Sequence, residues 1–79
     1  MKLKVIGSNM TELTVGGWKI LFSYETPVAA INVVQAKKTS KKWSVTTSRH
    51  IGKWFQIHSI ENYSEMPQEW FDTLAENIK

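Results

Sequence analysis

Residues 11–24 read TELTVGGWKILFSY, and this stretch decides the fold. It holds two runs of alternating side chains, residues 11–15 and residues 18–24, which are joined by Gly16 and Gly17. Because both glycines can adopt the positive φ that a primed two-residue turn requires, the pattern is typical of a β-hairpin. We therefore predict two antiparallel strands that pair directly.

Further strands are indicated on both sides of this hairpin. A short candidate strand precedes it at residues 3–5. Pro27 interrupts the chain after the hairpin, since proline cannot donate a ladder hydrogen bond. The mostly apolar residues 28–35 then predict a strand that is central or covered on both faces. We expect residues 37–42 to form a loop and residues 43–47 to pair back as the next strand.

The period changes after this strand. Ser48 can cap a helix by accepting a backbone hydrogen bond. The side chains that follow at helical spacing on one face are Ile51, Trp54, Phe55 and His58. Gly52 disfavours a helix by about 1 kcal/mol relative to alanine, and the sequence WFQIHS also alternates. We prefer a helix, and a strand over residues 53–59 stays open as the alternative.

A second helix is predicted at the end of the chain. Pro67 suits the first turn of a helix, where a missing N–H is harmless. The apolar stripe of this helix consists of Trp70, Phe71, Leu74 and Ile78, and its acidic face of Glu69, Asp72 and Glu76. The expected fold is a single α+β domain over residues 1–79. It has a small antiparallel sheet of about four or five strands, with the C-terminal helices packed on one face.

Composition excludes several classes of protein. The 79 residues include four tryptophans and no cysteine, so neither a disulfide framework nor a zinc–thiolate site is possible. No apolar run approaches the ~20 residues that span a bilayer, and the start MKLKVIGSNM lacks the features of a secretion signal. We expect a soluble intracellular protein with no membrane partner. Whether the tryptophans are core or surface residues stays open.

Charge is unevenly distributed along the chain. Residues 37–53 hold six basic side chains and no acid, which gives +6 in a chain whose net charge is +3. Residues 1–36 carry +1 and residues 61–79 carry −4. Such segregation can steer a charged partner, or the two halves can neutralise each other.

Three motifs resemble a known family. They are SNMTEL at residues 8–13, LFSYETPVA at residues 21–29 and WSVTTSRHIGKW at residues 43–54. With a closing helix that begins Pro-Gln-Glu, they resemble short uncharacterised proteins encoded by bacteriophages and prophage-like regions. The resemblance covers nearly the whole chain and implies a viral origin, with the host cytoplasm as the location. The family has no assigned activity, cofactor or binding residue, and the lysine-rich residues 32–42 are not assumed to belong to its pattern.

The titratable residues do not form a catalytic pattern. His50 and His58 are eight residues apart, and no carboxylate lies at a helical offset to orient the ring of His50. The chain has neither an H-E-x-x-H motif nor a glycine-rich phosphate loop. Ser48 lies near His50 but has no third partner for a triad. We expect a non-enzymatic protein with no cofactor and no metal.

Nucleic-acid binding is the leading hypothesis. Lysines can neutralise phosphates, Trp43 can stack on a base, and Ser44 and Thr46, on one strand face, can contact the backbone. The residues predicted to bind are Lys37, Lys38, Lys41, Lys42, Trp43, Arg49, His50 and Lys53.

Two other kinds of binding stay open. The alternative function is a protein-docking module that inhibits or modulates a host or viral protein. The same charge segregation would also support homo-oligomers. A third possibility is a small anion held by Arg49 and the backbone N–H groups at the Ser48 helix start. Arg49 is also a candidate for an ion pair with Glu61 or Glu65.

Overall fold

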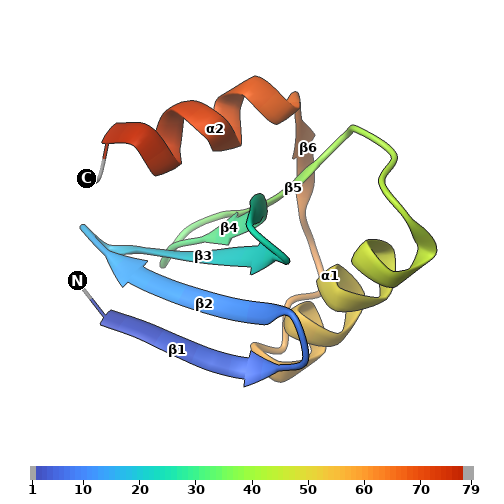
Figure 1. Ribbon diagram of the computed structural model, residues 1–79. Coiled ribbons are helices and arrows are strands. Elements are labelled where there is room, and N and C mark those ends of the chain that lie inside the picture. The colour runs from blue at the N-terminus through green and yellow to red at the C-terminus, as the bar shows by residue number, and fades with distance from the viewer. Residues whose placement is uncertain (1, 78–79) are drawn as a thin grey trace.

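A computed structural model describes residues 2–77 as six strands and two helices. The elements are β1 (Lys2–Gly7), β2 (Met10–Val15), β3 (Trp18–Ser23), β4 (Thr26–Ile31), β5 (Ala36–Thr39), α1 (Val45–Ile57), β6 (Ser64–Met66) and α2 (Gln68–Asn77) (Figure 1). The strands form one sheet in the order β1-β2-β3-β4-β5-β6. Neighbours are antiparallel except β5 and β6, which are parallel. The α+β class is confirmed, but the sheet is mixed and has more strands than predicted.

The predicted hairpin is confirmed as β2 and β3. Their register runs without interruption from Met10 opposite Ser23 to Val15 opposite Trp18. Gly16 and Gly17 form the turn with φ values of 55° and 82°. Both angles lie in the left-handed region, which a side chain at Cβ disfavours. The glycine pair therefore fixes the register of the two central strands.

A β-bulge shapes the next pairing. Leu21 lies opposite Ala29 and Phe22 lies opposite Pro27, so Val28 is an extra residue on β4. A bulge is one of the few places in a sheet where proline is tolerated. The bulge lets Val28 and Ala29 enter the same buried cluster although they are adjacent in sequence.

The strand β4 ends earlier than predicted. The Asn32 side chain accepts hydrogen bonds from the backbone N–H groups of Val34 (2.9 Å) and Gln35 (2.8 Å). This side-chain turn competes with strand pairing, so the strand stops at Ile31 instead of continuing to residue 35.

The predicted loop over residues 37–42 is confirmed only for residues 40–42, and the predicted strand over residues 43–47 is wrong. Lys37 and Lys38 lie in β5, and Val45 already begins α1. The helix starts early because Ser44, rather than Ser48, is the N-cap and accepts a hydrogen bond from the Thr47 N–H at 3.3 Å. Ser48 is therefore an exposed residue inside the helix.

The helix interpretation is confirmed for most of residues 53–59. The helix α1 runs to Ile57, and Ser59 follows in the left-handed region with φ 56°. The closing helix is confirmed as well, because α2 begins at Gln68, directly after Pro67. The predicted stripe residue Ile78 lies outside the described residues.

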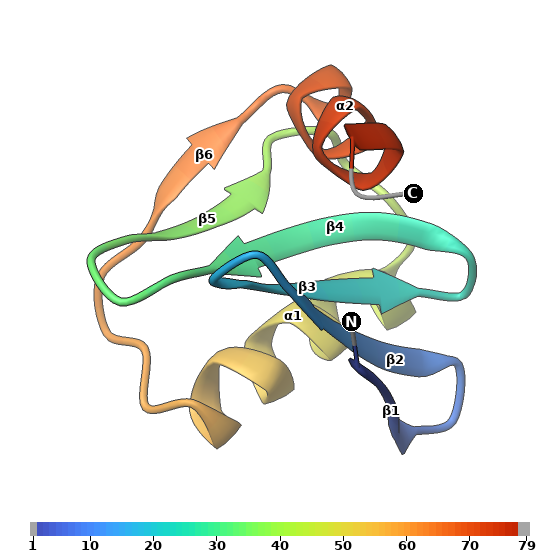
Figure 2. The same ribbon diagram turned by 90° about the vertical axis from the view of Figure 1, so that its left-hand side faces the viewer.

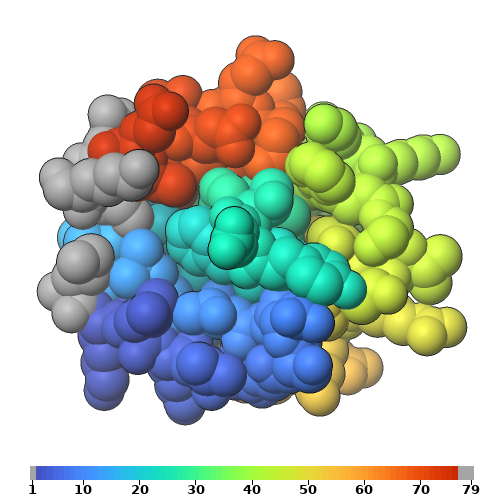
Figure 3. Space-filling view, in the orientation of Figure 1, coloured from blue at the N-terminus to red at the C-terminus, as the bar shows by residue number. Residues whose placement is uncertain are grey.

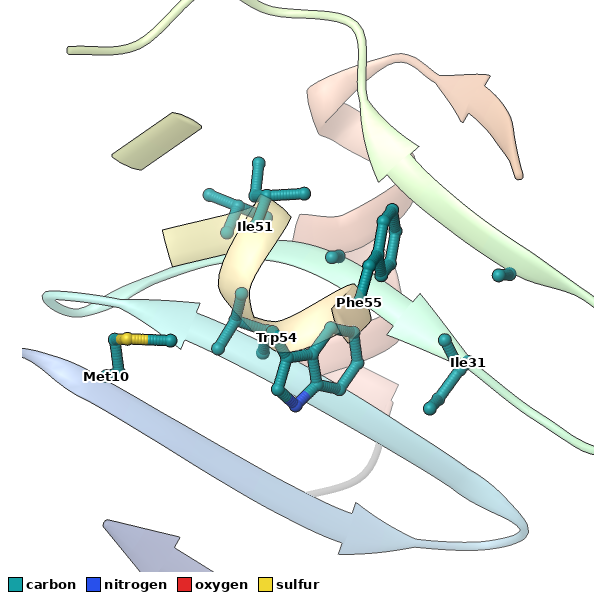
Figure 4. Close-up of a cluster of buried hydrophobic side chains, with 9 residues drawn as sticks. Met10, Ile31, Ile51, Trp54 and Phe55 are labelled. Carbon is teal, nitrogen blue, oxygen red and sulfur yellow. The ribbon is translucent and has the colours of Figure 1, made fainter. Parts of the chain in front are cut away.

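The two helices lie on opposite faces of the sheet, so the prediction that both pack on one face is wrong (Figure 2). The reason is that β3 and β4 are apolar on both faces, and each face needs a cover. Side chains on one face pack under α1 with Ile51, Trp54 and Phe55 (Figure 4). Ile20 and Ala30 point to the other face and pack with Phe71 of α2.

The four tryptophans divide between core and surface. Trp54 belongs to α1 and is fully buried. Trp18 and Trp70 are half-buried and meet edge to face, with ring centroids 5.6 Å apart. Trp43 is the most exposed of the four, with 38 % of its surface accessible to solvent. Across residues 2–77, no helix is long and apolar enough to cross a membrane.

Candidate functional site

A groove of about 610 Å³ lies between β5, the loop that follows it, and one flank of α1. This loop arches outward between β5 and α1 (Figure 1). Ile51 and Phe55 also line the groove but are almost fully buried, and the apolar side chain of Val45 in the lining is exposed. The lining also includes three lysines, Lys38, Lys41 and Lys42, and the exposed aromatic side chains of Trp43 and Tyr63. The groove therefore combines three cations, one acid (Glu65), ring faces and an apolar surface.

Four of the eight predicted binding residues line this groove, namely Lys38, Lys41, Lys42 and Trp43. Lys37 does not line it, because successive side chains of a strand point to opposite faces. Its Nζ lies 5.8 Å from the Trp70 ring centroid and 3.4 Å from Ser64 Oγ. Lys37 therefore belongs to the α2 side of the sheet.

Arg49 and Lys53 lie on the exposed side of α1, outside the groove lining. They are four residues apart and therefore share one helix face. In the part of the chain that the structure describes, neither forms an ion pair, so the expected pairing of Arg49 with Glu61 or Glu65 is absent. Arg49 directly follows Ser48 and Lys53 directly follows Gly52, and both of these neighbours line the groove.

His50 is a packing residue and does not line the groove. Its Nδ1 lies 2.8 Å from Ser23 Oγ, and the same hydroxyl lies 3.0 Å from Thr47 Oγ1. Ser23 is only 2 % exposed. This hydrogen-bonded group joins the first half of α1 to the end of β3, and Tyr24 packs beside the imidazole with ring centroids 6.0 Å apart.

A lysine lies over each of the two exposed aromatic side chains of the groove. Lys41 Nζ lies 4.2 Å from the Trp43 ring centroid, and Lys38 Nζ lies 5.0 Å from that of Tyr63. Contacts of this kind stabilise by about 0.5–1 kcal/mol at exposed sites. Lys38 also lies 3.7 Å from a carboxylate oxygen of Glu65. Tyr63 was missed in the sequence because no local pattern connects it with a lysine loop more than twenty residues away.

Trp43 is oriented by the first residue of α2. Its indole Nε1–H donates to Gln68 Oε1 at 3.1 Å, and the Thr39 hydroxyl donates to the same oxygen at 2.8 Å. The amide nitrogen of Gln68 donates in turn to the Pro27 carbonyl at 2.7 Å. The family motif included Gln68 only as part of a helix start and gave no sign of this role.

The sheet separates the basic and the acidic helix. The helix α1 has two cationic residues and no acid, whereas α2 has three acids and no cationic residue, and the two helices cover opposite faces. Within residues 2–77, the pair Lys38–Glu65 is the ion pair that joins the basic segment to the acidic one. An exposed pair of this kind is worth about 0–1 kcal/mol. The two halves of the charge pattern therefore do not neutralise each other inside the protein.

A buried carboxylate fixes the far end of α1. Glu12 is 7 % exposed, and its Oε1 accepts from Trp54 Nε1 at 2.9 Å and contacts His58 Nε2 at 2.5 Å. Burial alone raises the pKa of the Glu12 carboxyl. The hydrogen bonds from Trp54 and His58 and the charges of His58 and Lys19 outweigh burial and hold this pKa below its ordinary value. His58 therefore acts in packing, and the described residues contain no cluster of three or more metal-ligating side chains.

Fold and site together define a small α+β domain with a basic–aromatic groove beside one helix. Residues 1–73 match the model of a family of unknown function, DUF8033, and the chain belongs to this family. The expectation of an uncharacterised family is confirmed by this match. No curated protein and no solved structure matches the chain.

Proposed function

We propose that this protein binds single-stranded nucleic acid along the groove between β5 and α1. The observation that carries the proposal is that three lysines and two exposed aromatic side chains line one groove, and two of the lysines lie over the two rings. Proteins that bind single strands combine a basic track for the phosphates with aromatic side chains on which bases stack. The helix α1 beside the groove has no acid, and most of the acidic helix α2 lies on the other face of the sheet.

The phosphate contacts come from Lys38, Lys41 and Lys42, and Arg49 and Lys53 extend the cationic surface across the outer face of α1. Neutralising phosphates releases counterions, so the affinity falls with salt. For three contacts on a single strand, the slope of log K against log salt is about −2. The slope approaches about −3.5 if the two helix cations also take part.

The base contacts come from Trp43 and Tyr63, whose faces carry Lys41 and Lys38 in the free protein. On binding, each lysine moves from its ring to a phosphate and a base takes its place. A stacked base is worth about 1–3 kcal/mol. The displaced cation–π contact is worth about 0.5–1 kcal/mol, so the exchange favours the complex. Duplexes keep their bases stacked inside and gain only the lysine contacts, so single strands bind more tightly.

The proposed role is non-enzymatic. His50 and His58 are bonded to Ser23 and Glu12 rather than turned toward the groove. The motifs shared with bacteriophage and prophage-like proteins support a phage accessory protein that acts in the host cytoplasm. Induction of the gene together with phage genes, and recovery of the protein in the cytoplasmic fraction, would test that origin and location.

Fluorescence anisotropy with a labelled oligonucleotide of about 12 nucleotides tests the binding. Titrations at about 50 and 200 mM salt give the slope, and a hairpin duplex of the same length gives the preference for single strands. The variant Lys41→Glu/Lys42→Glu should abolish binding. Its matched control, Lys2→Glu/Lys4→Glu, makes the same charge change at the opposite edge of the sheet and should retain most of the affinity. Equal losses of affinity in both variants would show that binding depends on net charge alone and not on the groove.

A further inference from the structure

The strand β1 is an open edge of the sheet. It is six residues long, pairs on one side with β2, and has no strand on its other side among residues 2–77. Figure 2 shows it at the margin of the sheet with no element beyond it. The opposite edge, β6, has only three residues. A long free edge presents unpaired backbone N–H and C=O groups to any extended chain that fits.

One face of β1 is apolar. The register aligns four side chains of β1 to β4 in one row, namely Leu3, Leu13, Ile20 and Ala30. Phe71 of α2 packs on Ile20 and Ala30, but Leu3 is 68 % exposed and its neighbour Val5 is 75 % exposed. The helix α2 therefore covers the part of the apolar row on β3 and β4 and leaves its end on β1 exposed. Figure 3 shows the blue surface of β1 and β2 uncovered by α2.

The other face of β1 is cationic. Lys2 and Lys4 alternate with the two apolar residues and are both exposed. Glu12 lies opposite Lys4 in the register, but its carboxylate is buried and bonded to Trp54 and His58. Over residues 2–77, no carboxylate lies within ion-pair distance of Lys2 or Lys4. The edge thus offers a backbone ladder, an apolar face and two unpaired cations.

We propose that β1 pairs with an extended segment of another protein in which acidic and apolar side chains alternate. In such β-augmentation the backbone bonds provide affinity and the alternate side chains provide specificity. Acidic side chains of the partner would lie beside Lys2 and Lys4, and apolar ones beside Leu3 and Val5. A second copy fits less well, because a symmetric antiparallel pair of β1 strands places the lysines of both copies on one face, where like charges repel. This surface is separate from the groove, so either proposal can fail without the other.

The probe is a synthetic peptide of alternating glutamate and valine, and its control is the peptide of alternating lysine and valine. In NMR titrations of the full chain, the acidic peptide should shift the backbone amides of residues 2–7 and leave those of the groove unchanged. Lys2→Glu/Lys4→Glu should weaken the interaction by about tenfold or more, since two cross-strand attractions become repulsions. Lys41→Glu/Lys42→Glu is the matched control and should bind the peptide as the wild type does.

Leu3→Thr/Val5→Thr is the second variant, because it places β-branched residues, which favour strands, at both positions while it removes the apolar contact. It should also lose affinity for the acidic peptide, with an unchanged circular dichroism spectrum. Equal binding of the two peptides, or shifts outside β1, would overturn the proposal. So would a dimer in analytical ultracentrifugation that Leu3→Thr/Val5→Thr abolishes, since the occupant of the edge would then be a second copy.

Discussion

Replacing the buried Glu12 by glutamine tests how α1 is held on the sheet. The carboxylate accepts a hydrogen bond from Trp54 Nε1 at 2.9 Å and contacts His58 Nε2. Trp54 is fully buried, so these contacts fix the side chain at the centre of the cluster under α1. Glutamine has nearly the same shape, and its single carbonyl oxygen can still accept from Trp54. Trp54 and His58 contact the same oxygen, Oε1, so the variant makes both contacts neutral, while it leaves the packing intact.

The expected loss follows from the kind of bond removed. A hydrogen bond to a charged group contributes about 1.5–3 kcal/mol, and a neutral one about 0.5–1.5 kcal/mol. Glu12→Gln replaces two hydrogen bonds to a charged oxygen by two to a neutral one. We therefore expect the free energy of unfolding to fall by about 2 kcal/mol at pH 6. Glu25→Gln is the control, because Glu25 is an exposed carboxylate, and the change there should be within about 0.5 kcal/mol.

The pH dependence has a definite sign. The pKa of Glu12 is lowered in the folded protein, so the folded state favours the carboxylate more than the unfolded state does. This contribution is present above the ordinary carboxyl pKa of about 4.3, and it is lost as the pH falls through the lower folded value. The difference between wild type and Glu12→Gln should therefore be largest at pH 6 and shrink below about pH 4.

Urea unfolding, followed by tryptophan fluorescence at a series of pH values, measures this difference. The wild type and both variants should unfold with the same denaturant slope. A Glu12→Gln protein as stable as the wild type at pH 6, or a difference that grows on acidification, would refute the role assigned to the buried carboxylate.

Three further substitutions test other parts of the structure. Ser44→Ala removes the hydrogen bond to the Thr47 N–H and should cost about 1 kcal/mol of unfolding free energy, and an unchanged stability would show that α1 does not depend on this cap. Gly17→Val places a branched side chain at φ 82° and should cost about 1–2 kcal/mol by chemical denaturation; a neutral effect would contradict the hairpin turn. His50→Ala leaves the buried Ser23 hydroxyl without its imidazole partner and should cost about 1–3 kcal/mol, with oligonucleotide affinity unchanged in anisotropy. A large loss of affinity for the oligonucleotide with unchanged stability would show that His50 takes part in binding.

Local signals in the sequence were sufficient for part of the fold. Gly16 and Gly17 indicate a hairpin because their conformation is fixed by two adjacent residues, and Pro67 marks the start of α2 for the same reason. The state of residues 37–47 was mispredicted because it depends on tertiary pairing. Lys37 and Lys38 become strand residues by pairing with β4 and with β6, and the three residues of β6 have no periodicity of their own.

The faces covered by the helices were mispredicted for a related reason. An apolar stripe shows that a helix covers something, but it does not show which side of a sheet the chain reaches. Here β6 is the edge strand that follows α1, and the chain crosses at this edge to the opposite face, on which α2 packs. The adjacent apolar residues Ile20 and Leu21 of β3 point to opposite faces of the sheet. This pair was the signal in the sequence that both faces need a cover.

The candidate site was half predictable from the sequence. Lys38, Lys41, Lys42 and Trp43 line the groove because they are close along the chain. Arg49 and Lys53 belong to the same charged block but lie outside the groove lining on α1. Tyr63 lines the groove and Gln68 bonds to Trp43, both from distant segments, and no spacing in the sequence connects them with the groove.

The indole N–H resonance of Trp43 gives the most direct measurement of binding in the groove. Titration with a short oligothymidine should shift this resonance, together with the backbone amides of Lys41 and Ser48, while those of β1 and of α2 beyond its first turn stay in place. The shifts should diminish as salt is raised and disappear in Lys41→Glu/Lys42→Glu. A titration in which the Trp43 resonance does not move, or in which the shifts cluster on another face of the sheet, would contradict nucleic-acid binding in the groove.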